Sequence, residues 1–287
     1  MNLQTCAETH EVTNQVPPLD GANLYRIDLP LQQWVQRYHA GWAEDRLDRY
    51  GALAGGPLMQ AGFLANENRP LFKSHDRYGH RIDLVEFHPA YHELMRAAVE
   101  HGIPSLPWSE PQSGAQVARA ALMYLHNQAE AGSSCPLTMT YASVPALRLQ
   151  PDLAECWLPK ILAREYDPRN LPMEQKAGVT IGMAMTEKQG GTDVRANSTR
   201  AYPVGAGGPG QAYELIGHKW FCSAPIVRCL PHVGADRQGP VLLPAAASSP
   251  GWHAQPVLYP APEEQAGQLG QRLQRSRIPR CAGLDGR

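Results

Sequence analysis

The spacing of apolar residues changes near residue 175, and this change limits the fold more than any other feature of the sequence. Before it, apolar side chains recur every three or four residues in four stretches, at 31–42, 91–98, 117–129 and 153–161. That spacing places them on one face of an amphipathic helix. The sequence therefore predicts a helical domain over residues 1–175.

Single residues in these stretches give finer predictions. Pro89 stands at the start of the second helix, where the first turn tolerates proline. Ser113 precedes the third helix and is predicted to be its N-cap. Trp34, Tyr38 and Trp42 lie on the apolar face of the first helix, so we expect them to pack in the core.

After residue 175 the pattern becomes that of strands. The short apolar run AGVTIGMAM, residues 177–185, indicates a buried strand. Residues 195–204 and 211–223 alternate as half-buried strands do, and the turn composition GAGGPG at 205–210 is predicted to join them as a hairpin. Helices followed by antiparallel strands indicate an α+β fold with a partial β-domain over residues 176–225.

Composition changes again after residue 225. Residues 220–287 contain no Lys, Asn, Thr or Met and are rich in Pro, Ala, Gly, Gln and Arg. This composition is typical of disorder or low complexity. A GC-rich gene read in the wrong frame gives the same composition. We therefore expect residues 226–287 to form a separate, disordered tail.

Charge and hydropathy exclude several kinds of protein. A formal net charge of −1 gives no overall attraction to nucleic acid or membrane. No apolar run reaches bilayer-spanning length, and the polar start MNLQTCAETHEV is unlike a signal peptide. The six cysteines are scattered without paired spacing, which favours reduced thiols. These features predict a soluble, cytoplasmic protein.

The segment MAMTEKQGGTDV, residues 183–194, is the strongest candidate for a site. Gly190 and Gly191 remove side-chain bulk, so that a ligand can come close to backbone N–H groups, and Thr186 and Thr192 place hydroxyls on either side. From spacing alone we favour a tight turn in which the glycines only supply positive φ. A phosphate-binding P-loop is excluded because GxxxxGK[ST] is absent.

The strand GHKWFCSAP, residues 217–225, favours a ligand site over a simple turn. Trp220, Phe221 and Ser223 offer an aromatic face and a hydroxyl, which suit the flat ring and polar edge of a flavin. The pair TEKQGGTD and KWFCS resembles the acyl-CoA dehydrogenase family, where a TExxxGSD-like loop and a KxWIT-like strand embrace FAD. The resemblance narrows to the AidB branch, which is linked to the adaptive response to DNA alkylation.

Other segments carry the same resemblance, which covers about residues 10 to 225 and leaves out the tail. They are NQVPPLDGANLYRIDLPL (14–31), DRYGHRIDLVEFHPAYHELM (76–95), CPLTMTYASVPAL (135–147) and GMAMTEKQGGTDVRANSTRA (182–201). The resemblance implies that two segments line FAD. The expected cofactor contacts are Met183, Ala184, Met185, Thr186, Glu187, Lys188, Gln189, Gly190, Gly191 and Thr192, with Phe221, Cys222 and Ser223.

The resemblance also implies a reaction and partners. FAD takes a hydride from Cβ of an acyl-CoA while a carboxylate removes the α-proton. In the family, that carboxylate and the basic DNA-binding face of the AidB branch belong to a C-terminal helical domain. Nothing after residue 225 resembles that domain, so the catalytic residue is unknown. Family members are homotetramers, and double-stranded DNA is a further implied partner.

Other functions stay open. The chain could be a non-catalytic homologue that protects or binds DNA, or a decayed fragment. His88 and His92 have a spacing that binds zinc on a helix, but HExxH needs a glutamate between them, and Glu93 follows both. The basic run QRLQRSRIPR, residues 271–280, is more typical of a solvated tail than of a phosphate site. We expect no metal site.

The reading frame downstream of Pro225 tests the origin of the tail. We hypothesise that the frame is lost there, by mutation or by a sequencing error, because the resemblance stops where the composition changes. Translation of the gene in a shifted frame is expected to restore a helical acyl-CoA dehydrogenase tail. The hypothesis fails if no shifted frame does so.

Overall fold

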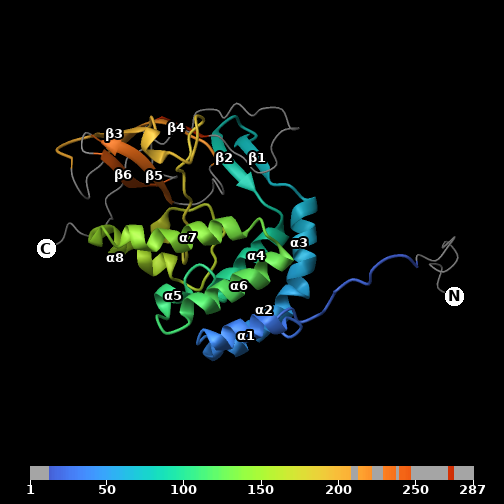
Figure 1. Cartoon of the computed structure of the whole chain (residues 1–287). Helices are drawn as coiled ribbons and strands as arrows, with labels where there is room; N and C mark the ends of the chain where they lie inside the picture. Colours follow the sequence, from blue (N-terminus) through green and yellow to red (C-terminus); the bar gives the residue numbers. More distant parts are fainter. Residues whose placement is uncertain (1–12, 208–212, 222–228, 237–238, 247–270, 275–287) are drawn as a thin grey trace.

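The computed structural model describes residues 13–207, 213–221, 229–236, 239–246 and 271–274. Helices make up its first part, and strands gather after residue 199 (Figure 1). The α-helices are α1 (Leu29–Arg37), α2 (Glu44–Ala54), α3 (Pro57–Glu67), α4 (Pro89–Glu100), α5 (Leu106–Ser109), α6 (Ala115–Ala129), α7 (Ser134–Leu147) and α8 (Pro151–Ile161). Short 3-10 turns lie at η2 (Gly41–Ala43), η3 (Met173–Gln175) and η4 (Val194–Ala196).

The main core lies between helices α2, α3, α4 and α6. Leu47, Leu94, Leu122 and Leu125 are fully buried there. The last three come from the stretches in which apolar residues recur every three or four positions, and the four predicted helical stretches correspond to α1, α4, α6 and α8. The helical prediction is therefore confirmed for these stretches, except that α1 ends at Arg37 instead of reaching residue 42.

The ends of two helices test the predicted caps. Pro89 occupies the first turn of α4, as expected. Ser113 does not cap α6, because that helix begins after Gly114, which has a φ of 78°. A Cβ at Gly114 would lie 2.3 Å from the carbonyl oxygen of His39. Close backbone approach, rather than a hydroxyl cap, determines this helix start, so the Ser113 prediction is wrong.

The aromatic stripe of α1 is also predicted wrongly. Trp34 and Tyr38 are 53% and 45% exposed, and Trp42 is 39% exposed. The rings of Trp34 and Tyr38 stack on the surface with centroids 5.1 Å apart. Val35 is the buried residue of this helix. Trp34 and Tyr38 are four positions apart and line up beside the core face instead of on it, whereas Trp42 lies beyond the end of α1, in η2.

Sequence analysis missed a β-hairpin inside the helical part. Strands β1 (Leu71–His75) and β2 (Arg81–Glu86) pair antiparallel. Asp76 makes the turn between them, since its Oδ1 accepts hydrogen bonds from the backbone N–H groups of Tyr78 (2.8 Å) and His80 (2.9 Å). Gly79 supplies a φ of 83° at the same turn. An Asp three positions before a Gly, in DRYG at 76–79, was the signal available in the sequence.

A second, smaller core joins the helices to the segment before the loop. Val179 and Ile181 pack on Val144, Trp157 and Ile161 of α7 and α8, which lie between the strands and the other helices (Figure 1). The segment 177–185 contains buried residues, as expected, but forms isolated bridges instead of a strand. The reason lies in its hydrogen bonds, since the Ile181 N–H donates to a side chain, Thr140 Oγ1, at 2.9 Å.

The strands after this segment form one sheet of order β6-β5-β3-β4-β7. Its members are β3 (Arg200–Pro203), β4 (Tyr213–Lys219), β5 (Cys229–Asp236), β6 (Gly239–Ala246) and β7 (Gln271–Gln274). β3 and β4 pair antiparallel, with Arg200 opposite Ile216, which confirms the predicted hairpin. Within the predicted tail, β5, β6 and β7 are described, and the other residues after 221 lie outside the described ones.

Helices followed by antiparallel strands confirm the α+β prediction. The domain boundaries at residues 175 and 225 stay predictions. In the described part of the chain, no helix is both long and apolar enough to cross a membrane. Cys135 is a free cysteine, whereas Cys156 in α8 is disulfide-bonded, so the expectation of reduced thiols is wrong at Cys156.

One buried histidine bridges α2 and α6 inside the main core. His126 Nδ1 lies 2.7 Å from Tyr50 Oη, and its Nε2 lies 2.8 Å from Ser133 Oγ. All three side chains are buried. Two hydroxyl partners suit a neutral imidazole, which donates through one nitrogen and accepts through the other. Burial lowers the pKa of His126 from its ordinary 6.5 to about 4.

Stability is expected to fall on mild acidification because of His126. The folded pKa lies below the unfolded one, so the unfolded chain binds the proton more tightly, and stability decreases as pH falls from 6.5 to about 4. The full effect is roughly 3 kcal/mol. Urea unfolding between pH 7 and pH 5 should show a weaker pH dependence in His126→Gln, and an unchanged one in the exposed control His75→Gln. Equal slopes in wild type and His126→Gln would contradict this.

Candidate functional site

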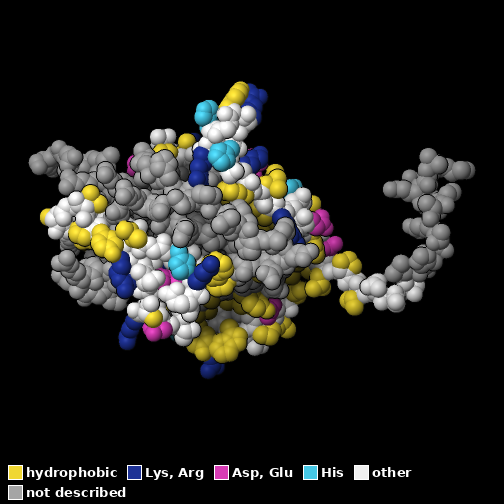
Figure 2. Space-filling view, turned by 90° about the horizontal axis from the view of Figure 1, so that it is seen from above, with side chains coloured by type: hydrophobic (Ala, Val, Ile, Leu, Met, Phe, Trp, Pro, Cys, Tyr) yellow, Lys and Arg dark blue, Asp and Glu magenta, His cyan; other side chains and the backbone are white. Residues whose placement is uncertain are grey.

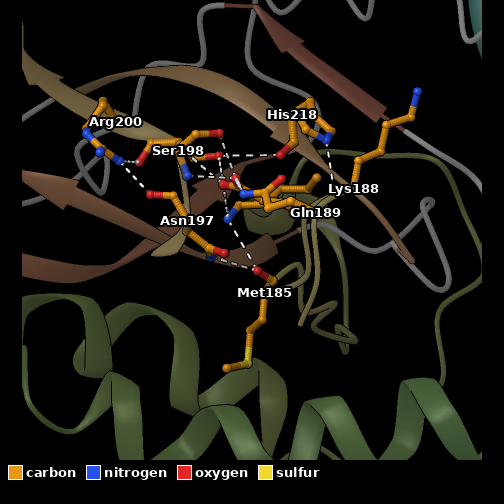
Figure 3. Close-up of polar contacts among 10 residues, drawn as sticks. Met185, Lys188, Gln189, Asn197, Ser198, Arg200 and His218 are labelled. Atoms are coloured by element: carbon orange, nitrogen blue, oxygen red, sulfur yellow. Dashed lines mark hydrogen bonds and ion pairs between the residues drawn. The ribbon is translucent and has the colours of Figure 1, made fainter. Parts of the chain in front are cut away.

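The two segments that sequence analysis selected lie side by side. The Trp220 N–H donates to the Thr186 carbonyl oxygen at 2.8 Å. The Lys188 N–H donates to His218 Nε2 at 3.0 Å, as Figure 3 shows. Residues 186–188 therefore run antiparallel to residues 218–220, although about thirty positions separate them in the chain.

The loop itself is a tight turn. Glu187 and Gly190 exchange backbone hydrogen bonds of 3.2 and 3.0 Å. Gly190 has a φ of 148°, and a Cβ placed on it would have no atom within 4 Å. A Cβ on Gly191 would instead lie 2.7 Å from Thr186 Oγ1. Gly190 thus supplies the positive φ that the simpler interpretation expected of both glycines, whereas Gly191 permits the close approach to Thr186. Open space lies above Gly190.

Glu187 points into the protein. Its side chain is fully buried, and its carboxylate accepts hydrogen bonds from the backbone N–H and the hydroxyl of both Ser198 and Thr199. Gln189 Nε2 adds a bond of 2.6 Å, and Lys219 Nζ lies 3.1 Å away. Burial alone raises the pKa of Glu187, but the bonds from Thr199 and Ser198 outweigh it and hold that pKa well below its ordinary value.

The remaining predicted contacts differ in their exposure. Ala184 is buried, Met183 and Thr186 are half-buried, and the exposed ones are Met185, Lys188, Gln189, Gly190, Gly191 and Thr192. Phe221 is 47% exposed and has a φ of 55°, which is uncommon for a bulky residue. Met185 and Phe221 are the chain neighbours of the hydrogen-bonded Thr186 and Trp220. Cys222 and Ser223 lie outside the described residues.

Sequence analysis missed the residues that hold these segments together. Asn197 Nδ2 donates to the Met185 carbonyl oxygen at 2.9 Å (Figure 3). Among the described residues, Asn197 Oδ1 is one of the few buried side-chain oxygens without a hydrogen-bond partner. Lys219 is fully buried although lysine is normally exposed. Lys219 is an even number of positions from the apolar Leu215 and from Gly217 in β4. Strand alternation therefore places it on their face of the sheet, and this was the one signal that Lys219 faces inward.

The histidines of α4 have separate structural roles. His88 caps the helix, with its Nδ1 accepting from the Ala90 N–H at 3.2 Å. His92 Nδ1 lies 2.9 Å from Tyr166 Oη, and burial lowers the pKa of His92. No group of three metal-binding side chains occurs among the described residues. Nothing in this geometry supports a zinc site at the two histidines.

Gly217 is expected to be essential for the close approach of β4 to this network. A Cβ there would lie 2.4 Å from Thr199 Oγ1 and 2.7 Å from Thr199 Cα, and its φ is 156°. Gly217→Ala should reduce the free energy of unfolding by about 2 kcal/mol. The control is Gly205→Ala in the same hairpin, where a Cβ meets nothing within 4 Å. Equal urea midpoints for the two variants would show that the approach at Thr199 is not required.

Comparison with known proteins identifies the relatives of this chain. The family model described as "Adaptive response protein AidB N-terminal domain" matches residues 14–168, which is more than half of the chain. AidB of Escherichia coli (strain K12) is 46% identical over 221 residues, which cover 76% of this chain and 40% of that protein. Acyl-CoA dehydrogenase family member 11 of Caenorhabditis elegans is 27% identical over 180 residues, covering 62% and 28%.

Two solved structures share the fold. Bd2924 in its apo form has a TM-score of 0.76 and 24% identity, and covers 93% of this chain and 56% of that one. Caenorhabditis elegans ACDH-11 in complex with C11-CoA has a TM-score of 0.70 and 20% identity, with coverages of 97% and 50%. The chain spans only part of the length of each relative. Family model and sequence identity together show that the chain belongs to the AidB branch of the acyl-CoA dehydrogenase family.

Proposed function

We propose that residues 183–192 and Phe221, with Cys222 and Ser223 beyond the described residues, belong to one side of an FAD site in an acyl-CoA dehydrogenase-like oxidoreductase of the AidB type. The observation that carries the proposal is the antiparallel pairing of Thr186 with Trp220 and of Lys188 with His218. It brings a glycine-containing loop and an aromatic strand end to the same place. Family membership supports FAD as the cofactor.

The described residues fit a flavin. Met185 and Phe221 are exposed, and each is the chain neighbour of a residue in the Trp220–Thr186 hydrogen bond, so they offer apolar surface for a flat ring. Gly190 leaves space for the close approach of a ligand to the backbone. The left-handed conformation of Phe221 costs free energy, and such residues cluster at ligand sites. Thr186 and Thr192 supply hydroxyl donors at the polar edge.

When bound, FAD supplies hydride acceptance from an acyl thioester. This chain's own residues would hold and orient the ring, with Phe221 against its face and the threonines as donors to its edge. No described residue is assigned as the base that removes the α-proton. The acyl-CoA substrate, the oxidation at Cα–Cβ, a homotetramer and a cytoplasmic location are proposals for the whole protein. The complex of ACDH-11 with C11-CoA supports an acyl-CoA as the ligand class.

A DNA-protecting homologue without catalysis is the competing function. The description of the matched family as an adaptive response protein supports it. On the described part of the face in Figure 2, Lys and Arg side chains are dispersed among hydrophobic and uncharged ones rather than gathered in one field. A strong DNA-binding surface needs clustered positive charge. The flavin proposal has in addition the contact between the two predicted segments.

Binding of FAD by the purified chain tests the proposal. Because these segments form one side of a slot, we expect little flavin to copurify, and added FAD to bind with a Kd of roughly 10 µM or weaker. Phe221→Ala should weaken binding by about threefold or more through the loss of ring packing. Tyr202→Ala, an exposed aromatic on β3, is the matched control and should bind as wild type does.

Two outcomes would count against this assignment. If Phe221→Ala binds FAD as tightly as wild type, the flavin binds elsewhere. If the chain is purified with one flavin per molecule, the expectation that these segments form only one side of the site is contradicted. Dye reduction with straight and branched acyl-CoAs then measures catalysis separately. A gel-shift titration with double-stranded DNA measures the competing function on the same preparation.

A further inference from the structure

The most unusual feature beneath the loop is a fully buried ion pair. Lys219 Nζ lies 3.1 Å from Glu187 Oε1, and the relative exposure of both side chains is 0%. Removing two charges from water is costly unless both are paired and hydrogen-bonded. The cost of burying this pair must be offset by further hydrogen bonds to both groups, and the surrounding residues provide them.

The contacts of the pair connect three separate pieces of chain. Through Oε1 and Oε2, Glu187 holds the backbone N–H groups of Ser198 and Thr199 at 2.7 and 2.9 Å, just before β3. Lys219, at the end of β4, donates to Glu187 and also to the Met185 carbonyl oxygen at 3.4 Å. Figure 3 shows these bonds converging between the loop and the strands. The ion pair thus links the loop, the start of β3 and the end of β4.

The same contacts fix the register of two segments, residues 185–188 and 218–221, which form the two walls of the proposed site. The bonds from Trp220 to Thr186 and from Lys188 to His218 lie immediately on either side of the pair. A side-chain link between residues 187 and 219 cannot form if the segments slide by one residue, because neighbouring side chains point to opposite faces. Lys188, next to Glu187, is accordingly exposed, and its Nζ lies over the Trp220 ring at 5.4 Å.

We propose that Glu187 and Lys219 are positioning residues that set the spacing and register of the two walls, rather than cofactor contacts. The role assigned to the walls rests on the proposed flavin site, whereas the link itself does not. In this arrangement the buried carboxylate cannot touch a ligand. Glu187 acts through the backbone of Ser198 and Thr199, whereas Lys219 acts through the carbonyl oxygen of Met185. Together they determine where Met185 and the end of β4 stand.

Amide hydrogen exchange of the whole chain tests the link directly. The Trp220 and Lys188 amides report the wall-to-wall bonds, and α6 amides such as Leu122 report global stability. In Lys219→Met, which leaves Glu187 unpaired, we expect the two wall amides to exchange about tenfold faster or more, with α6 amides changing much less. Glu187→Gln keeps the shape of the side chain and should give a smaller change in the same amides.

Lys160→Met is the matched control. It removes a partly buried lysine that donates to the Lys176 carbonyl oxygen at 2.5 Å, away from the walls, and should leave the Trp220 and Lys188 amides unchanged. Unaltered wall amides in both Lys219→Met and Glu187→Gln would overturn the proposal. So would an equal acceleration in α6, which marks a general loss of stability. If Lys219→Met does not fold, Glu187→Gln decides the question alone.

An FAD titration of the same variants separates this inference from the proposed function. Faster wall exchange together with weaker FAD binding supports both. Faster wall exchange with FAD binding unchanged keeps the positioning link, but overturns the flavin assignment of these walls. If the wall amides of the variants exchange at the wild-type rate, the positioning role of Glu187 and Lys219 is rejected, whether or not FAD binding changes.

Discussion

The contact between Glu187 and Lys219 is the interaction on which the β part of this structure depends. A carboxylate and an ammonium share a site without solvent, and the cost of burying them is offset only because backbone and hydroxyl donors from Ser198 and Thr199 complete the carboxylate's shell. The partners are fixed in direction, so the pair tolerates one arrangement of the chain. An apolar contact in the same place would accept many more.

The helical part is organised differently. Its core consists of leucines and alanines on facing helices, with one polar bridge from Tyr50 through His126 to Ser133. Burial of apolar area stabilises it without directional demands. The two kinds of stabilisation meet where Thr140 of α7 accepts the Ile181 N–H. That bond attaches the start of the loop segment to the helical scaffold.

Much of this organisation could be predicted from the sequence because it is local. Spacings of three and four gave four helices, and alternation around GAGGPG gave the β3–β4 hairpin. The stripe of α1 failed because periodicity says which residues share a face, but not which neighbour covers that face. Trp34 and Tyr38 therefore stayed on the surface. The partnership of Glu187 with Lys219 could not be predicted, since the two residues are 32 positions apart and lysine normally marks a solvated face.

The separation of the pair also has a consequence for synthesis. Glu187 leaves the ribosome 32 residues ahead of Lys219. At ordinary elongation rates this interval lasts roughly 2–6 s. During that time the helices can already pack, whereas the carboxylate must remain hydrated because its counter-charge has not been translated. The loop can therefore settle only after the helices have been made.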